Sequence, residues 1–254
     1  MPDLNISNLS LALTGLLIVI ALIIDSKEKL GLRKDIIIAT IRTVVQLFAI
    51  GYILGYIFEI DNTIVTFVMV LFIIFNAAFQ GAKSAEGIDH SFAISLLAIG
   101  VGTFVSLGVM LFSGALKWIP SQIIPITGMI ASNAMTAIGV GYRTMRSKYT
   151  DQRQQVLERL SLGANASQAS QSIIRASIKS AMGPTVDTTK TVGLVSLPGM
   201  MSGMIFAGVD PIAAIRYQII VMFMLISTTG FSTMISSYLA YRSYFNDKVQ
   251  LVIK

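Results

Sequence analysis

RTMRSKYTDQRQQVLERLSLGANASQASQSIIRASIKSAM, residues 143–182, is the longest polar interval in an otherwise apolar sequence. Hydrophobic stretches lie on both sides of it. The interval is too long for a simple connection between two helices, which usually takes about two to eight residues. Residues 143–183, called the polar segment below, are therefore predicted to be a docking element inserted between membrane spans.

The composition of the chain indicates a membrane protein. Of its 254 residues, 54% are hydrophobic and 13% are charged, with a mean hydropathy of +0.74. Soluble domains carry about 25% charged residues, so lipid must cover much of this surface. The absence of cysteine excludes a disulfide framework and thiolate metal sites. The net charge of +6 is attributed to basic loops on one side of a membrane rather than to nucleic-acid binding.

Seven hydrophobic stretches approach the roughly 20 residues that a helix needs to cross a bilayer. They are Leu9–Ile24, Ile36–Phe58, Thr63–Phe79, Phe92–Leu116, Ile119–Tyr142, Val192–Val209 and Pro211–Tyr241. The sequence therefore predicts an all-α polytopic membrane protein with about seven transmembrane helices. Residues 1–254 are expected to form a single permease domain, with the polar segment between the fifth and sixth spans.

The distribution of lysine and arginine predicts the orientation. Most of the 19 basic residues fall in the loops after the first, third and fifth stretches and in the C-terminal tail. Positively charged loops stay in the cytoplasm. The N-terminus is therefore expected outside, and the C-terminus and the polar segment are expected in the cytoplasm.

Two groups of residues within the spans are candidates for a translocation path. Lipid offers no partner to an amide, so the amides should face other helices or a water-filled path. The methionines could supply thioether ligands for soft metals, although methionine also fills irregular packing. The candidates are Gln46, Asn76, Gln80, Asn133, Met200, Met201 and Met204.

Proline and glycine are expected to break the helices of the fifth and sixth spans. Pro125 and Gly128 interrupt the fifth, and Pro198 and Gly199 interrupt the sixth. Paired broken helices in a membrane protein point to a transport path. The identity of any metal ligand remains open.

The sequence contains no recognisable catalytic constellation. With one histidine and no cysteine, most acid–base and nucleophilic pairs are excluded, and no phosphate-binding G-x-x-x-x-G-K-[ST] loop is present. The chain is therefore expected to be a non-enzymatic subunit without a cofactor of its own. If transport is active, ATP and magnesium should bind to a separate chain.

Within the polar segment, the sequence predicts two short helices. Val156, Leu157 and Leu160 have helical spacing over residues 152–162, and Gly163 should end that helix. Asn165 or Ser167 can cap a second helix that runs to about residue 181, before Pro184. Such a pair suits insertion into a groove on a partner, or alternatively a position on the membrane surface.

The stretch ERLSLGANASQAS, which begins at Glu158, resembles the cytoplasmic coupling motif of ABC transporter permeases. Glu158, Ser161, Gly163 and Ala164 match that motif, whereas Arg159 and Leu160 replace its usual pair of alanines. Three further stretches resemble the FetB family of iron-export permeases: VLFIIFNAAF from Val70, IPITGMIASNAM from Ile124 and PTVDTTKTVGLVSLPGMMSGMIFAGVDP from Pro184. The resemblance covers nearly the whole chain.

This resemblance implies a function that composition alone does not. FetB-like permeases work with a separate FetA-like ATPase in the bacterial cytoplasmic (inner) membrane, export iron and relieve metal-driven oxidative stress. By analogy with ABC transporters, two permeases and two ATPases would assemble, and Glu158, Ser161, Gly163 and Ala164 would couple them. The alternatives are an ABC permease for another metal or small solute, a gradient-driven carrier or channel, and a membrane scaffold or sensor that transports nothing.

Overall fold

The computed structural model describes residues 8–253, and within that range the regular secondary structure consists of helices. The chain divides into two compact units, Met1–Asp61 and Asn62–Lys254. The first unit contains α1 (Asn8–Thr14), α2 (Leu16–Glu28) and α3 (Arg33–Ile60). The second contains α4 (Thr63–Ala82), α5 (Ser91–Phe112), α6 (Pro120–Asp151), α7 (Arg153–Ser161), α8 (Ala166–Thr191), α9 (Gly199–Phe206), α10 (Pro211–Ala240) and the 3-10 helix η1 (Tyr241–Tyr244).

Five helices in the described part of the chain are long and apolar enough to cross a membrane. They are α3, α4, α5, α6 and α10 continued by η1. The all-helical class and five of the expected spans are thus confirmed, whereas the count of seven and the orientation are not.

The two remaining stretches form shorter helices. Residues 8–28 are divided at Gly15 into α1 and α2, which have 7 and 13 residues. Between residues 192 and 209, Gly193 has a φ of +84° and Pro198 precedes α9, which has only 8 residues. Neither α1, α2 nor α9 alone reaches the roughly 20 residues of a full span.

In the first unit, a buried carboxylate fixes the turn between α2 and α3. The side chain of Asp25 is 4% exposed, and its Oδ1 accepts a hydrogen bond of 2.7 Å from the backbone N–H of Leu32. The backbone carbonyl of Asp25 also accepts from Leu30 at 3.1 Å. Asp25 therefore accepts two hydrogen bonds from the turn between α2 and α3, one through its side chain and one through its backbone carbonyl.

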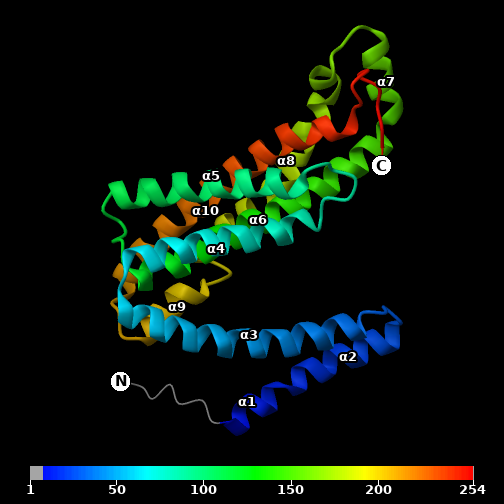
Figure 1. The fold of residues 1–254 in the computed structure, drawn as a ribbon. Coiled ribbons are helices and arrows are strands. Elements are labelled where there is room, and N and C mark those ends of the chain that lie inside the picture. The colour runs from blue at the N-terminus through cyan, green and yellow to red at the C-terminus, as the bar shows by residue number, and fades with distance from the viewer. Residues whose placement is uncertain (1–7, 254) are drawn as a thin grey trace. The chain divides into compact units, whose positions relative to one another are not determined.

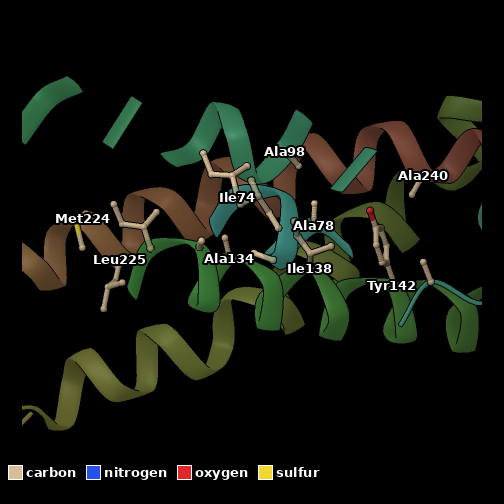
Figure 2. Packing of buried hydrophobic residues seen from close by; sticks show 14 of the residues in the cluster. Ile74, Ala78, Ala98, Ala134, Ile138, Tyr142, Met224, Leu225 and Ala240 are labelled. Carbon is tan, nitrogen blue, oxygen red and sulfur yellow. The ribbon is translucent and has the colours of Figure 1, made fainter. Parts of the chain in front are cut away.

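In the second unit, α4, α5, α6 and α10 lie side by side, with α7 at one end and α9 towards the other (Figure 1). Figure 2 shows that the side chains between these helices are mainly small or branched, such as Ala78, Ala98, Ala134 and Ile138. Small residues let the helix backbones approach closely, which stabilises helix pairs in lipid, where no hydrophobic force acts between them.

Hydrogen bonds between side chains join α5 to α10. The hydroxyls of Ser106 and Thr228 lie 2.5 Å apart, and the hydroxyl of Ser232 donates to the backbone carbonyl of Ala98 at 3.0 Å. Gly102 lies between them, where a Cβ atom would meet the Ser232 hydroxyl at 2.5 Å and the Thr228 carbonyl at 3.3 Å. Position 102 therefore has no room for a larger residue.

We expect Gly102→Ala to lower the free energy of unfolding by about 1–3 kcal/mol, because the added methyl group forces α5 and α10 apart. Thermal unfolding in detergent measures this change. Gly108→Ala on the same helix is the matched control, since no atom of another helix lies within 4 Å of its Cβ position. If Gly102→Ala is as stable as Gly108→Ala, the close packing of α5 on α10 is contradicted.

The expected break at Pro125 and Gly128 and the expected helix end before Pro184 are both wrong. α6 runs without interruption through Pro125 and Gly128, and α8 continues through Pro184 to Thr191. Each proline removes a single N–H from the helical ladder. The other bonds of each long helix remain, so one missing N–H does not end it.

Candidate functional site

Residues 143–151 of the polar segment extend α6, and the rest of it forms α7 and most of α8, which are joined by a tight turn. α7 ends at Ser161, and Gly163 adopts a φ of +88°. Glycine is the residue that takes this left-handed conformation without steric strain. The N–H of Gly163 donates to the carbonyl of Leu160 and that of Ala164 to the carbonyl of Arg159, each at 3.0 Å. The predicted helix end at Gly163 is confirmed.

Asn165 caps α8, which settles the choice between Asn165 and Ser167. Its side chain accepts a hydrogen bond of 2.9 Å from the N–H of Gln168, and the Gln168 side chain accepts one of 3.0 Å from the N–H of Asn165. This reciprocal capping box satisfies two N–H groups that the helix leaves free. The start of α8 is therefore encoded locally.

We expect Asn165→Ala to destabilise the start of α8 by about 1 kcal/mol, the usual effect of losing such a cap. Hydrogen exchange should then become faster at the amides of residues 166–168 and stay unchanged in α10. Ser167→Ala is the control, because Ser167 does not cap the helix. Equal exchange rates in the two variants would show that the cap is unimportant.

Arg159, which departs from the ABC motif, holds α7 against α8. Its Nη1 donates to the backbone carbonyl of Ala169 at 3.1 Å and to the hydroxyl of Ser172 at 2.9 Å. The bonds cross the turn at Gly163. A charged side chain therefore holds the two helices together across the turn.

The predicted coupling residues lie at the tip of this structure. Glu158, Ser161 and Gly163 are exposed, and Ala164 is half-buried. Between them, Leu162 exposes 88% of its surface.

A cluster of aromatic residues connects the polar segment to two long helices. The ring of Tyr149, at the end of α6, stacks on that of Tyr244 in η1 with centroids 4.1 Å apart. The hydroxyl of Tyr149 donates to the hydroxyl of Ser170 in α8 at 2.6 Å. All three residues are buried. Tyr149 therefore ties α6, α8 and η1, which continues α10, at a single point.

Sequence reasoning did not find this cluster. Tyr149 and Tyr244 are far apart in the chain, and nothing in the sequence pairs them. A possible signal was the position of both tyrosines at the polar ends of apolar spans, where an amphipathic ring is favoured.

A polar face of α6 lies on the surface of this chain. Ser132 and Thr136 are exposed at helical spacing, and Asn133 is half-buried beside them. Asn133 and Thr136 line a cavity of about 110 Å³ together with Pro184, Thr185 and Thr188 of α8. Each of these side chains bonds to its own helix, because Ser132 and Asn133 donate to the carbonyl of Met129 at 3.2 and 2.9 Å and Thr136 donates to that of Ser132 at 2.9 Å.

The structure brings some of the predicted path residues together and leaves others apart. Asn133 lines the cavity between α6, α8 and α10. Met201 lines a different cavity, formed by α8, α9 and α10, and Met222 lines both. Met200 and Met204 are half-buried in α9.

The remaining predicted path residues are exposed. Asn76 and Gln80 lie on one face of α4, where Asn76 donates to the carbonyl of Phe72 at 2.8 Å. Gln46 lies on α3, in the first unit. The expected break at Pro198 and Gly199 corresponds to the non-helical residues 192–198 and the start of α9.

Basic side chains gather where α4 and α6 reach the polar segment. Arg143 donates to the hydroxyl of Ser84 at 3.1 Å, and Arg146 forms an ion pair with Glu86. Lys83 lies over the ring of Phe79. In the part of the chain that the structure describes, no group of three or more His, Cys, Asp or Glu side chains could hold a metal ion.

Comparison with known proteins gives one family and several relatives along the whole chain. The model of a family described as "Uncharacterised protein family (UPF0014)" matches residues 8–245. The chain is 52% identical over 249 residues to "Probable iron export permease protein FetB" of Escherichia coli K12, covering 98% of this chain and 96% of that protein. No solved structure matches the chain.

More distant relatives include bacterial and plant proteins. The chain is 36% identical over 243 residues to "UPF0014 membrane protein YjkA" of Bacillus subtilis, covering 96% of this chain and 97% of that protein. It is 33% identical over 234 residues to "UPF0014 membrane protein STAR2" of Oryza sativa, covering 92% and 82% of the two chains.

Proposed function

The chain belongs to the UPF0014 family, and from that premise we propose that it is the membrane-spanning permease subunit of an ATP-driven exporter that moves iron out of the bacterial cytoplasm. The cargo is inferred from the Escherichia coli relative, whose name describes iron export. Such a subunit contributes to metal homeostasis and to resistance against metal-driven oxidative stress. It hydrolyses no ATP itself.

The observation that carries the proposal is the helix pair α7–α8, hinged at Gly163 and tied to the long helices through Tyr149. A soluble, FetA-like ATPase would receive the turn at residues 161–165 in a groove. When ATP and magnesium close two such ATPases, the helix pair would move with them as a rigid body. Tyr149 would transmit that motion to α6 and to η1, and so to α10.

The polar face of α6 supports a two-permease core. Ser132 and Thr136 are exposed and use their hydroxyl protons within α6, so their lone pairs are free to accept hydrogen bonds from a second copy of the chain. Two permeases and two ATPases would then enclose a path in the inner membrane. In the orientation set by the basic loops, the N-terminus lies outside and the polar segment lies in the cytoplasm.

Reconstitution tests the proposal directly. The chain is purified with any P-loop ATPase that accompanies it, placed in liposomes, and assayed for iron flux with and without ATP. We expect flux only when ATPase, ATP and magnesium are present, and only towards the side opposite the ATPase. Iron flux through the purified chain alone would contradict the proposal, and so would exposure of Gly163 to the cell exterior in labelling experiments.

A further inference from the structure

A cavity of about 380 Å³ lies at the end of α8, beside α9 and α10. Its lining includes the side chains of Thr189, Met201, Gln218 and Met222. The lining residues carry no ionisable side chain. The cavity shares Met222 with the smaller cavity that Asn133 lines, so the two cavities are neighbours.

Gln218 is the unexplained residue of this cavity. Its side chain is 4% exposed, and its Oε1 has no hydrogen-bond partner among the described residues. If the amide oxygen and nitrogen of Gln218 were assigned the other way round, the nitrogen would be the buried atom without a partner. A buried polar atom without a partner costs about 1–3 kcal/mol, so an amide held in this way indicates a missing ligand.

The neighbouring groups are donors of electron pairs. Met201 and Met222 are buried, at 8% and 5% exposed, and each carries a thioether sulfur. The hydroxyl of Thr189 uses its proton in a 2.8 Å bond to the carbonyl of Thr185, which leaves its lone pairs free. The thioether sulfurs, the Thr189 hydroxyl oxygen and the Gln218 carbonyl oxygen can each donate an electron pair to a cation.

The backbone adds a further acceptor. In a continuing helix, the N–H of Gly193 would bond to the carbonyl of Thr189, but it donates instead to the carbonyl of Ser196 at 2.9 Å. The helical ladder of α8 therefore ends beside the cavity. Carbonyls at the end of an interrupted helix are the groups that coordinate cations in membrane transporters.

We propose that Gln218, Met201 and Met222 form a transient site for a reduced cation of soft or borderline character, which in the proposed exporter is ferrous iron. Thioether sulfur favours such ions, whereas magnesium and calcium require oxygen ligands. Because the donors are neutral, the site binds without trapping the ion. This inference rests on the proposed function and specifies the form of iron that the permease carries.

The site is tested by ferrous-ion binding to the purified full-length chain in detergent under anaerobic conditions, in competition with a ferrous chelator. We expect Gln218→Leu to weaken binding at least about tenfold, the lower end of the loss caused by removing even an outer-shell partner of a metal. Met201→Leu/Met222→Leu keeps the volume and should weaken binding further. Met110→Leu, in α5 and buried to a similar degree, should bind as the unmodified chain does.

Spectroscopy separates ligation from a loss of structure. The iron X-ray absorption spectrum of the unmodified chain should contain a sulfur neighbour, and that neighbour should disappear in Met201→Leu/Met222→Leu. Gln218→Leu should unfold at the same temperature as the unmodified chain or at a higher one, because leucine fills a similar volume and leaves no unpaired amide. Unchanged ferrous affinity in both variants, or a spectrum without sulfur, overturns the site. The site is also overturned if the unmodified chain co-purifies with a lipid that Gln218→Leu does not retain, while ferrous binding is the same in both.

The flux assay distinguishes a failure of the site from a failure of the proposed function. If the unmodified chain and both variants export iron equally with ATP, the permease function stands and the site is wrong. If the unmodified chain binds ferrous iron through sulfur but shows no ATP-dependent flux, the site stands and the exporter assignment is wrong.

Discussion

Gly163→Pro is expected to abolish ATP-driven transport while the membrane-spanning helices stay folded. Gly163 has a φ of +88°, whereas proline requires about −65°. Proline also removes the N–H that donates to Leu160 at 3.0 Å. It disfavours the present conformation of Leu162, whose φ and ψ are −82° and 7°. The turn must therefore rearrange, and α7 loses its position against α8.

The measurement compares iron flux with ATP hydrolysis in liposomes that contain the permease and its ATPase. We expect flux to fall by at least about tenfold while ATP hydrolysis continues, because the motion of the motor no longer reaches the spans. Ala164→Asp places a charge at the same tip and should act in the same direction. Gly163→Ala keeps the N–H and adds only the left-handed strain of about 1–2 kcal/mol, so its effect should be smaller.

The thermal unfolding of the spans is the internal control for these variants. Circular dichroism should show the same helix content and nearly the same unfolding temperature as the unmodified chain. Full transport activity in Gly163→Pro would contradict the assignment of residues 158–164 as the coupling element. Loss of helix content would instead assign Gly163 a role in folding.

Tyr149→Ala is expected to have the largest effect on stability. It removes a buried ring that stacks on Tyr244 and packs edge-on to Phe245, together with the hydrogen bond to Ser170. Truncation of a large buried aromatic side chain costs about 3–5 kcal/mol. The connection between α6, α8 and η1 is lost at the same time, so coupling should fail at temperatures where the protein is still folded.

Two variants separate packing from hydrogen bonding at this position. Tyr149→Phe keeps the stacked ring and loses only the bond to Ser170, with an expected loss of about 1 kcal/mol. Tyr238→Ala truncates a ring on α10 that is 45% exposed and should leave coupling intact. Chemical denaturation and the ratio of flux to ATP hydrolysis are measured for each variant. If Tyr149→Ala and Tyr149→Phe are equally coupled, the aromatic stack does not transmit motion.

The features that the sequence predicted correctly depend on neighbours in the chain. Apolar length identified α3, α4, α5, α6 and α10 as spans, and helical spacing together with Gly163 identified α7. Asn165 was one of two candidate caps, and its partner Gln168 lies only three residues away. Local composition was enough for these features because the bonds that define them are local.

The predictions of helix breaks at Pro125 and before Pro184, and of a sixth span, were wrong because they applied single-residue or composition rules without the rest of the helix. Pro125 and Pro184 lie inside continuous helices, because each removes only one N–H from a long ladder whose other bonds persist. The sixth stretch was apolar enough for a span, yet Gly193 and Pro198 turn the chain before a long helix can form. The hydropathy of a stretch predicts whether it can lie in lipid, but it does not predict where the backbone turns.

By itself, the sequence determined that this chain is a helical membrane protein with a hinged, basic segment between spans, since composition and helical spacing are properties of the chain alone. Only the tertiary structure decided that Tyr149 meets Tyr244 and Ser170, and that Gln218 lies unpaired beside Met201 and Met222. Those contacts join α6, α8, α9, η1 and α10. The packing of the helices decides whether a polar atom finds a partner, and no stretch of sequence contains that packing.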